Sequence, residues 1–346
     1  MQTSSLYKTL RITRIIQETR DVKTFVLEGD EPIAYKAGQY LTFVFDIHGN
    51  ETRRSYSMAS SPVLQEPLSI TIKRVQNGLV SRPLFDHAQP GDVLTTTGAS
   101  GFFVLPEKID PGQQLFFMAA GSGIVPVYSL VKTVLHAYPG IKVVLIYSNR
   151  SEKDTIYLNE LKELQSNFAN NFQLEFLFSL SPDLARARLN QLLLQSLLKQ
   201  YAAVPADKML FYLCGPFAYM RMIEIELQTM GFVIDQVRKE QFNTNKPILR
   251  ITPPDTNPHN VEIRIDGNIH HLKVQYPQSI LDTAKKNGIV LPYSCEAGKC
   301  GSCAATCIQG KVWMMYNEVL LNDEVRNGLV LTCSGYPIEG DVILSY

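Results

Sequence analysis

Neither sign of charge is in excess in this sequence, whose 346 residues include 33 Lys and Arg and 33 Asp and Glu. Nucleic-acid-binding domains are normally basic, so this balance argues against nucleic acid as a partner. Gly and Pro are not enriched enough to indicate disorder, and internal repeats and low-complexity tracts are missing. The chain is too long for one ordinary core, so we expect two or three domains.

The first ten residues, MQTSSLYKTL, lack the apolar segment of a secretory signal peptide. We therefore expect a cytoplasmic protein whose six cysteines are reduced rather than paired in disulfides. Residues 111–131 contain no charged side chain and are long enough to span a bilayer. Glycines and a proline interrupt this stretch, so a buried strand, a turn and a helix start explain it better than a membrane span.

Two zones with different hydrophobic patterns make up the first two thirds of the chain. Residues 1–110 contain about six short segments that alternate apolar and polar side chains, which predicts an antiparallel β-barrel. Residues 111–242 alternate continuous apolar runs, such as QLFFMAA and KVVLIYS, with helical segments. That pattern predicts a parallel sheet covered on both faces, with ligands at the carboxyl ends of its strands.

A third zone follows a stretch rich in proline. Residues 243–258 contain four prolines and predict a semi-extended linker. Beyond it, residues 259–346 begin with a predicted hairpin that turns at Asp266 and Gly267. A short helix is expected next, with Ser279 as its N-cap and Gly288 at its end.

Four cysteines in this last zone have a distinctive spacing. Cys295, Cys300 and Cys303 form a C-x4-C-x2-C pattern, and Cys333 follows after 29 intervening residues. This spacing matches the ligands of a plant-type [2Fe–2S] cluster. Each of two irons needs two thiolates, so one loop must wrap around the cluster while a distant cysteine reaches its far side. The four cysteines therefore predict a [2Fe–2S] cluster.

The neighbours of these cysteines weigh against other uses of the thiols. Gly298 and Gly301 allow the positive φ angles of a wrapping loop and let backbone N–H groups approach the sulfurs. Structural zinc usually takes two close C-x2-C pairs, and here only Cys300 and Cys303 make one. Cys307 falls outside the pattern, and we expect it to be a small buried residue.

Two motifs of the first zone suit a phosphorylated aromatic cofactor. The first motif is Arg54-Ser55-Tyr56-Ser57. Its arginine can donate two parallel hydrogen bonds to a pyrophosphate, its tyrosine can stack on a large aromatic ring, and Ser57 has a short side chain that can donate a hydrogen bond. Alone, an Arg and a Tyr on one strand are usually a surface pair. A phosphate cradle is also plausible about twenty residues further on, at Lys73, Gly78 and Ser81.

The second zone adds a glycine turn and two strand ends. GSGIVP, residues 121–126, follows a predicted strand and opens a helix, although glycines after a strand are common. LCGPFAYM places Cys214 at the tip of another strand, with Gly215 and Pro216 before a helix. Glu240, Gln241 and Phe242 close the zone.

Together and in this order, these motifs resemble the ferredoxin–NADP reductase superfamily over residues 8–242, and LPYSCEAGKCGSC resembles the α+β β-grasp fold of plant-type ferredoxins. The fusion is similar to reductase components of multicomponent oxygenases and shares the domain order of phenylacetyl-CoA epoxygenase reductases. The resemblance implies an FAD-binding β-barrel domain at 1–110, an NAD(P)-binding α/β domain at 111–242, a linker at 243–258 and a ferredoxin domain at 259–346. The family commonly has Arg after the first cysteine, where this chain has Glu296.

The resemblance also implies roles for individual residues. For FAD, it implies Arg54 at the phosphates, Tyr56 on the isoalloxazine and Ser57 at N5, with Lys73, Gly78, Val80 and Ser81 lining the rest. For the nicotinamide nucleotide, it implies Gly121, Ser122, Gly123, Val125 and Pro126 at the pyrophosphate, Cys214, Gly215, Pro216 and Glu240 around the nicotinamide, and Phe242 as the aromatic near the flavin. Ser57, Cys214 and Glu240 are the expected catalytic residues. Many relatives have Thr in place of Val125.

The implied activity is electron transfer from NAD(P)H through FAD and the [2Fe–2S] cluster to a partner oxygenase or hydroxylase. The chain has neither a Glu-x-x-His pair for a di-iron site nor a C-x-H Rieske spacing, so the terminal oxidation must occur on another protein. A stand-alone reductase of ferredoxin or small acceptors stays open. A non-enzymatic redox sensor would not need the flavin and nicotinamide motifs.

The choice of nucleotide depends on the end of the strand KVVLIYS. Ser148, Asn149 and Arg150 stand there, close to Lys153, where the adenosine ribose is expected to bind. An arginine fork suits a 2′-phosphate, so we predict NADPH. Two acidic residues nearby, at 152 and 154, leave NADH possible. Arg150 and Lys153 could also be solvated loop charges without a ligand.

Overall fold

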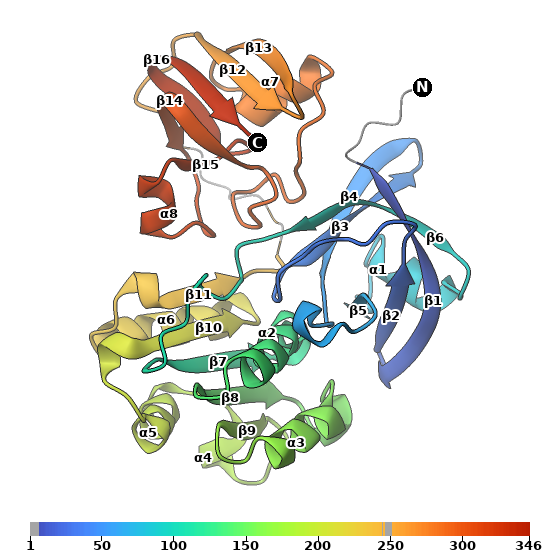
Figure 1. The fold of residues 1–346 in the computed structure, drawn as a ribbon, viewed down its shortest axis with the longest axis vertical. Helices are drawn as coiled ribbons and strands as arrows, with labels where there is room; N and C mark the ends of the chain where they lie inside the picture. Colours follow the sequence, from blue (N-terminus) through green and yellow to red (C-terminus); the bar gives the residue numbers. More distant parts are fainter. Residues whose placement is uncertain (1–6, 244, 246–250) are drawn as a thin grey trace. The chain divides into compact units, whose positions relative to one another are not determined.

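The chain forms two compact units, and the computed structural model describes residues 7–243, 245 and 251–346. The first unit extends to Gln241 and the second begins at Phe242. Figure 1 shows the helices and strands of both units, coloured along the sequence. The first unit contains an antiparallel sheet and a parallel sheet, which is the order that the hydrophobic patterns predict.

Six antiparallel strands form the barrel of the first unit in the order β4-β3-β6-β1-β2-β5. They are β1 (Lys8–Thr19), β2 (Val22–Glu28), β3 (Tyr40–Ile47), β4 (Asn50–Ser57), β5 (Ser69–Lys73) and β6 (Val93–Ser100), with α1 (Ser81–His87) before the last. A bridge between Met58, directly after β4, and Ile70 of β5 brings the two outer strands together. Alternate side chains, such as Leu10 and Ile12 of β1, are buried inside, which confirms the predicted barrel.

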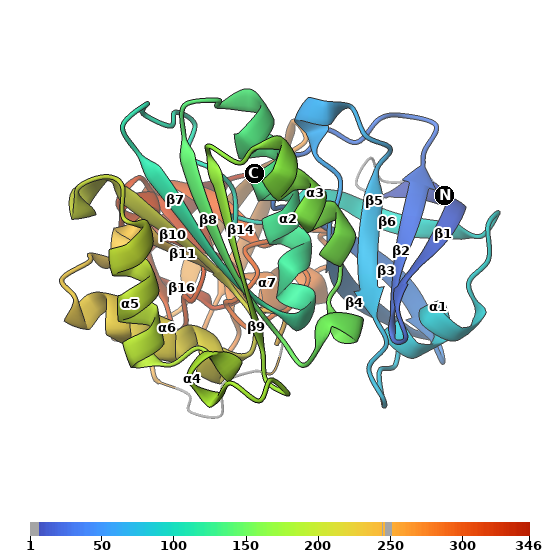
Figure 2. The same ribbon diagram turned by 90° about the horizontal axis from the view of Figure 1, so that it is seen from below.

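Five parallel strands form the second sheet of this unit in the order β11-β10-β7-β8-β9. They are β7 (Gln114–Ala120), β8 (Lys142–Asn149), β9 (Phe172–Phe178), β10 (Met209–Cys214) and β11 (Val237–Glu240). The helices are α2 (Ile124–Ala137), α3 (Leu158–Asn167), α4 (Leu184–Ala187), α5 (Gln191–Tyr201) and α6 (Phe217–Thr229). Figure 2 shows the barrel and this sheet from below.

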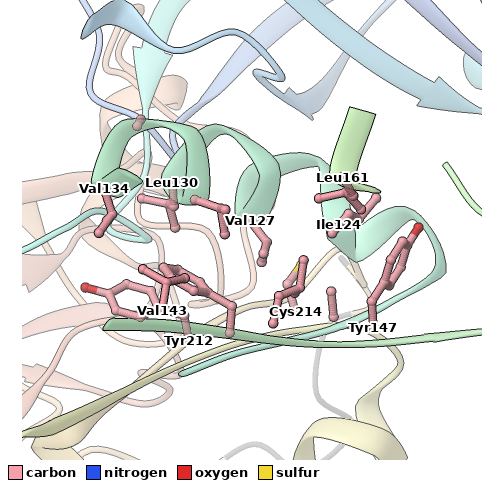
Figure 3. Close-up of a cluster of buried hydrophobic side chains, with 14 of the residues drawn as sticks. Ile124, Val127, Leu130, Val134, Val143, Tyr147, Leu161, Tyr212 and Cys214 are labelled. Carbon is pink, nitrogen blue, oxygen red and sulfur yellow. The ribbon is translucent and has the colours of Figure 1, made fainter. Parts of the chain in front are cut away.

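Helices cover both faces of the parallel sheet, as its continuous apolar strands require. On one face α2 and α3 pack against alternate strand residues, and on the other α5 and α6 do so. Figure 3 shows Ile124, Val127 and Leu130 of α2 above the sheet, with Cys214 and Tyr147 among the side chains beneath them. This packing fixes the strand ends from which the predicted nucleotide site is built.

Buried polar contacts join the barrel to the parallel-sheet part of the first unit. The hydroxyl oxygens of Thr24 and Thr71 are 2.7 Å apart in the barrel, and Thr71 also hydrogen-bonds the hydroxyl of Tyr157 before α3. The hydroxyls of Ser61 and Thr133, at 2.8 Å, make a second link between the two parts. No motif in the sequence predicts these contacts, because the partners are far apart along the chain.

The second unit has a mixed five-stranded sheet in the order β13-β12-β16-β14-β15. Its elements are β12 (His259–Ile265), β13 (Asn268–Val274), α7 (Ile280–Lys286), β14 (Ala304–Met314), α8 (Asn322–Arg326), β15 (Leu329–Leu331) and β16 (Gly335–Ser345). Asp266 and Gly267 have φ angles of 48° and 75°, so the predicted hairpin turn is confirmed. Ser279 accepts from the backbone N–H of Asp282 and caps α7 as predicted.

The predicted linker falls partly outside the described residues, since 244 and 246–250 are not described. Residues 251–258 contain no helix or strand. Asp255 in this stretch accepts hydrogen bonds from the backbone of Asn257 and Glu339, at 2.9 and 3.0 Å, and lies 2.7 Å from His259 Nε2. These contacts attach the last part of the stretch to the second unit.

No helix in the described ranges is long and apolar enough to cross a bilayer. Residues 111–131 instead form β7, a short turn and the first half of α2, as predicted from their glycines and proline.

Candidate functional site

Strand β4 presents the first predicted cofactor residues. Arg54 and Tyr56 are two positions apart, so their side chains leave the strand on the same side. Arg54 is exposed, and its Nη1 donates to the Arg53 carbonyl at 2.7 Å. Tyr56 is half-buried against Phe43, with ring centroids 6.2 Å apart. An exposed guanidinium beside a fixed aromatic ring suits a phosphate joined to a flat heterocycle.

A cleft of about 730 Å³ lies between α1 and the tip of the β3–β4 hairpin. Phe45 and His48 line it on the hairpin side, and Gly78, Val80 and Arg82 line it on the other. Gly78 and Val80 are two of the residues predicted to line the FAD site. The cleft is therefore a candidate for part of that site.

The remaining predicted FAD residues lie near the start of α1 and the end of β5. The helix begins at Ser81, and a Cβ on Gly78 would lie only 2.2 Å from Ser81 Oγ. Glycine thus allows the chain to turn tightly at this point. Lys73 lies 3.5 Å from the Asp21 carboxylate, in an ion pair that is about half exposed. A role for Lys73 at the cofactor remains a prediction.

The glycine turn after β7 has the shape that close approach to a ligand requires. Gly121 has a φ of 54°, and the Tyr147 hydroxyl donates to its carbonyl at 3.0 Å. A Cβ on Gly123 would lie 2.1 Å from the Cys214 carbonyl oxygen, so no other residue fits there without backbone movement. The turn therefore packs tightly against the end of β10 directly before the start of α2, where backbone N–H groups can face an anionic ligand.

The other predicted residues of this segment differ in their burial. Ser122 is half-buried, whereas Val125 and Pro126 are buried within α2. Pro126 lies in the first turn of that helix, where its missing N–H costs nothing. Because both side chains are buried, their predicted contacts with a nucleotide remain predictions.

The three predicted catalytic residues lie together. Ser57 Oγ donates to the Glu240 carboxylate at 3.4 Å, which joins the end of β4 to the end of β11. Cys214 ends β10 and pairs in register with Glu240 on the neighbouring parallel strand. Burial, and secondarily the charge of Glu240, raises the pKa of the Cys214 thiol, so it stays protonated at neutral pH. Their catalytic roles remain predictions.

Polar groups without partners mark the carboxyl end of β8. Ser148 Oγ and Asn149 Nδ2 are buried and make no hydrogen bond to the described residues. Such groups normally have a partner, so a bound polar molecule at this strand end would satisfy them. Arg150, the next residue, is exposed. The arrangement fits a nucleotide at the strand ends of a parallel sheet.

Sequence reasoning missed a tyrosine at this strand edge. The Tyr219 hydroxyl, on α6, donates to the Ala119 carbonyl at 3.3 Å, beside the predicted Gly215 and Pro216. Burial raises the Tyr219 pKa. In the sequence Tyr219 is one aromatic residue within an apolar helix, so no signal could have identified it.

The four predicted cluster ligands approach one another in two pairs. Cys295 and Cys300 are close enough to shift each other's pKa, and Cys303 is close enough to Cys333 to raise the pKa of Cys333. The interaction between these two thiols lowers the pKa of Cys300 and raises that of Cys295, so one proton is held between them. Among the described side chains, no three of His, Cys, Asp or Glu converge on a single metal position. Two thiol pairs therefore fit two irons with two ligands each better than one zinc ion.

Backbone donors point at the sulfurs. The N–H of Ala297 donates to Cys295 Sγ at 3.4 Å, and the N–H of Ser302 donates to Cys300. Because thiolate ligands carry negative charge, such donors stabilise a bound cluster. The residues present in this loop fit the predicted [2Fe–2S] group.

The loop depends on positive φ angles, as its glycines predict. Gly298 and Gly301 have φ angles of 70° and 84°. A Cβ on Gly298 would lie 2.6 Å from the Tyr316 carbonyl oxygen, and the Gly298 N–H donates to Cys333. Gly298 thus lets the backbone approach both the segment after β14 and a predicted ligand.

Two further residues complete the comparison with the sequence. Cys307 is half-buried rather than buried, because a register shift between Cys307 and Gln309 interrupts the alternation of β14. Its expected burial is therefore wrong. Phe242 belongs to the second unit, and 48% of its surface is exposed. Its predicted place near the flavin remains a prediction.

Three domain families match successive parts of the chain. An oxidoreductase FAD-binding domain matches residues 9–105, and an oxidoreductase NAD-binding domain matches residues 117–224. A 2Fe-2S iron-sulfur cluster binding domain matches residues 263–337. These matches confirm the three predicted groups, FAD, a nicotinamide nucleotide and a [2Fe–2S] cluster.

Several curated relatives match almost the whole chain. The 3-ketosteroid-9-alpha-monooxygenase ferredoxin reductase component of Rhodococcus rhodochrous is 32% identical over 95% of this chain and 94% of its own length. The glycine betaine monooxygenase reductase subunit of Pseudomonas aeruginosa (strain UCBPP-PA14) is 31% identical over 97% of this chain and 94% of its own length. A 1,2-phenylacetyl-CoA epoxidase component of Escherichia coli (strain K12) is 30% identical over 98% of each chain.

Solved structures share the fold. Phthalate dioxygenase reductase superposes with a TM-score of 0.60 at 22% identity, over 98% of both chains. An intact type IV self-sufficient cytochrome P450 monooxygenase superposes with a TM-score of 0.71 at 19% identity. This chain covers 98% of its own length but 41% of that longer protein.

The fold and the sites define a flavin- and iron–sulfur-dependent reductase. The chain belongs to the ferredoxin–NADP reductase superfamily, in the group of oxygenase reductase components with a fused plant-type [2Fe–2S] ferredoxin domain. It is an NAD(P)H-dependent oxidoreductase that uses FAD and the cluster for electron transfer. The predicted multidomain fold class is confirmed.

Proposed function

We propose that this protein takes electrons from NADPH and delivers them to a partner oxygenase or hydroxylase, with an oxygenase of the phenylacetyl-CoA epoxygenase type as one candidate. The observation that carries the proposal is the meeting of Ser57, Cys214 and Glu240, from three strands, where the barrel joins the parallel sheet. Relatives named as monooxygenase reductase components support the choice of partner. We also propose a cytoplasmic location, which the six free thiols support.

The chain's own residues contribute position and charge. When bound, FAD accepts a hydride from the nicotinamide and releases electrons singly to the cluster, chemistry that side chains cannot supply. Arg54 would bind the FAD phosphates, and Tyr56 would pack on the ring system. Ser57 would face the flavin N5 region and hold Glu240 by the hydrogen bond already described. Cys214 would pack against the nicotinamide as a neutral thiol, since its pKa is raised by burial.

We propose four segments for this function: an FAD domain at residues 1–110, a nucleotide domain at 111–242, a linker at 243–258 and a ferredoxin domain at 259–346. The three family matches lie within the domain segments, at 9–105, 117–224 and 263–337. The contacts of Asp255 support a linker whose last residues are held by the ferredoxin domain.

The preference for NADPH rests on the charges after β8. Asp154 accepts from Ser151 Oγ at 2.6 Å, and Glu152 lies 3.7 Å from Lys162 Nζ. The two acidic residues that could bind a ribose hydroxyl therefore have local partners. Arg150 and Lys153 are exposed and pair with no acidic group in the described part of the chain. The positive charges of Arg150 and Lys153 at the end of β8 could therefore bind a 2′-phosphate.

Steady-state kinetics with both nucleotides tests this preference. We expect wild type to favour NADPH in kcat/KM. Arg150→Ala should reduce kcat/KM for NADPH by about tenfold, because a lost charge-assisted hydrogen bond costs about 1.5 kcal/mol, and should leave NADH nearly unchanged. Arg188→Ala, an exposed arginine before α5, serves as the control. A wild type that prefers NADH, or equal losses with both nucleotides, would refute the assignment.

The partner is tested by supplying candidate acceptors to the complete protein. We expect NADPH-dependent reduction of an oxygenase component to require both the flavin and the cluster. Turnover with free small acceptors alone, and none with any oxygenase component encoded beside this protein, would favour the stand-alone reductase instead.

A further inference from the structure

A lysine on α7 holds the residue that follows the first predicted cluster ligand. Lys285 Nζ donates to the carboxylate of Glu296 and lies 4.4 Å from the ring centroid of Tyr293. These two contacts are on either side of Cys295 along the chain. The ion pair is partly covered, with 39% of the Lys285 side chain and 25% of the Glu296 side chain exposed. Helix α7 therefore contacts the loop on both sides of Cys295.

The residue that Lys285 contacts, Glu296, has an unusual backbone conformation. Glu296 has a φ of 51°, in the left-handed region that non-glycine residues seldom adopt. The N–H of the next residue, Ala297, donates to Cys295 Sγ. A strained residue between a ligand and its hydrogen-bond donor persists only where its surroundings hold it. The ion pair with Lys285, which lies outside the loop, is one interaction that stabilises this conformation.

We propose that Lys285 neutralises the Glu296 carboxylate and so prevents it from lowering the reduction potential of the [2Fe–2S] cluster, with Lys285 as a positioning residue. Reduction adds one electron to the cluster and breaks no bond, so its equilibrium depends on nearby charge. An uncompensated Glu296 carboxylate would disfavour the added negative charge, and an uncompensated Lys285 ammonium would favour it. Joined as a pair, the two charges largely cancel. The proposal rests on the cysteine ligand assignment and is independent of the nucleotide and of the acceptor.

A double-mutant cycle on the full-length holoprotein tests this idea. At a fixed potential we expect Lys285→Met to lower the ratio of reduced to oxidised cluster by about three- to tenfold, because a neighbouring charge shifts such equilibria by up to about tenfold and partial exposure screens it. Glu296→Gln should raise the ratio by a similar factor. The double variant should return to within about twofold of wild type. A tenfold change corresponds to about 59 mV for one electron. Potentiometric titration followed by electron paramagnetic resonance gives the ratios.

A second ion pair of the same unit provides the matched control. Lys311 of β14 pairs with Glu339 of β16, with both side chains more than 60% exposed. Lys311 pairs with Ile338, which is five positions after the nearest predicted ligand, Cys333. Five extended residues span about 16 Å, about twice the screening length at physiological salt. Lys311→Met should therefore leave the ratio within about twofold of wild type.

Iron content and circular dichroism in the visible region are measured first on every variant. Protein without two irons per chain would refute the cluster assignment itself rather than the role of the pair. With the cluster intact, shifts of the same sign in both single variants, or shifts no larger than that of Lys311→Met, would overturn the proposal.

Discussion

Cys214 and Cys300 show how the surroundings of one side chain determine its chemistry. Cys214 is buried at the end of β10, and burial followed by the charge of Glu240 raises its pKa. Cys300 is one of four neighbouring cysteines, and its interaction with Cys295 together with the N–H of Ser302 lowers its pKa. The first thiol is therefore suited to packing beside a cofactor, whereas the second stands among the four cysteines that together suit a [2Fe–2S] cluster.

Replacing one ligand should separate the two halves of the electron path. We expect Cys300→Ser to keep NADPH oxidation with a hydride-accepting dye within about twofold of wild type, because the flavin half forms its own compact unit. Reduction of a one-electron protein acceptor should fall at least about a hundredfold, since three thiolates do not complete the cluster. Both rates are measured on protein with matched flavin content. Equal loss of both activities with FAD retained would contradict the sequential path.

Cys307→Ser is the control for this replacement. Its sulfur lies 3.4 Å from the Gln309 carbonyl oxygen, outside both ligand pairs. We expect neither activity to change in this variant.

Helices and strands of the first unit are joined by a polar interface. Tyr157 precedes α3 with a φ of 59°, and its ring stacks on Tyr128 of α2 with centroids 4.4 Å apart. Its hydroxyl reaches Thr71 of the barrel. Lys132 of α2 pairs with Glu66 of the barrel, and Ser129 donates to the Ser60 carbonyl at 2.6 Å. This interface sets the distance between the strands that carry Ser57 and Glu240.

Removing one hydroxyl tests the interface. Tyr157→Phe removes one buried hydrogen bond, while Thr71 keeps its bond to Thr24. We therefore expect a loss of about 1 kcal/mol in the free energy of unfolding. The maximal rate of dye reduction should fall several-fold while KM for NADPH changes little, because the site is built but less well aligned. Chemical denaturation and steady-state kinetics measure the two effects.

Tyr138→Phe is the matched control, because the Tyr138 hydroxyl at the end of α2 has no hydrogen bond in the described part of the chain. If both variants unfold at the same denaturant concentration, the interface hydrogen bond does not contribute as stated.

Hydrophobic periodicity predicts the strands of both sheets, because alternation and continuous apolar runs follow directly from which faces are buried. The cap at Ser279 and the turn at Gly267 were likewise predictable, since each depends on a local backbone requirement. Tyr157 and Lys285 could not be found this way. The Tyr157 partner is 86 residues away, and Lys285 reads as one of two exposed lysines at a helix end. Their roles arise only when tertiary packing brings distant segments together.

The whole molecule consists of a flavin- and nucleotide-binding unit and a ferredoxin unit joined within one chain. The ferredoxin segment, residues 259–346, carries 7 Lys and Arg against 9 Asp and Glu, a difference of −2, so it is nearly neutral. Covalent linkage supplies a high effective concentration without strong electrostatic attraction between the two units. Electron transfer between them should accordingly be intramolecular.

Anaerobic rapid mixing of the complete protein with NADPH tests this electron path most directly, with flavin absorbance and freeze-quenched electron paramagnetic resonance as readouts. We predict that the flavin is reduced first and the cluster second, with a rate for the second phase that does not change over a tenfold range of protein concentration. A cluster that stays oxidised, that is reduced before the flavin, or that is reduced at a rate proportional to protein concentration would contradict the account.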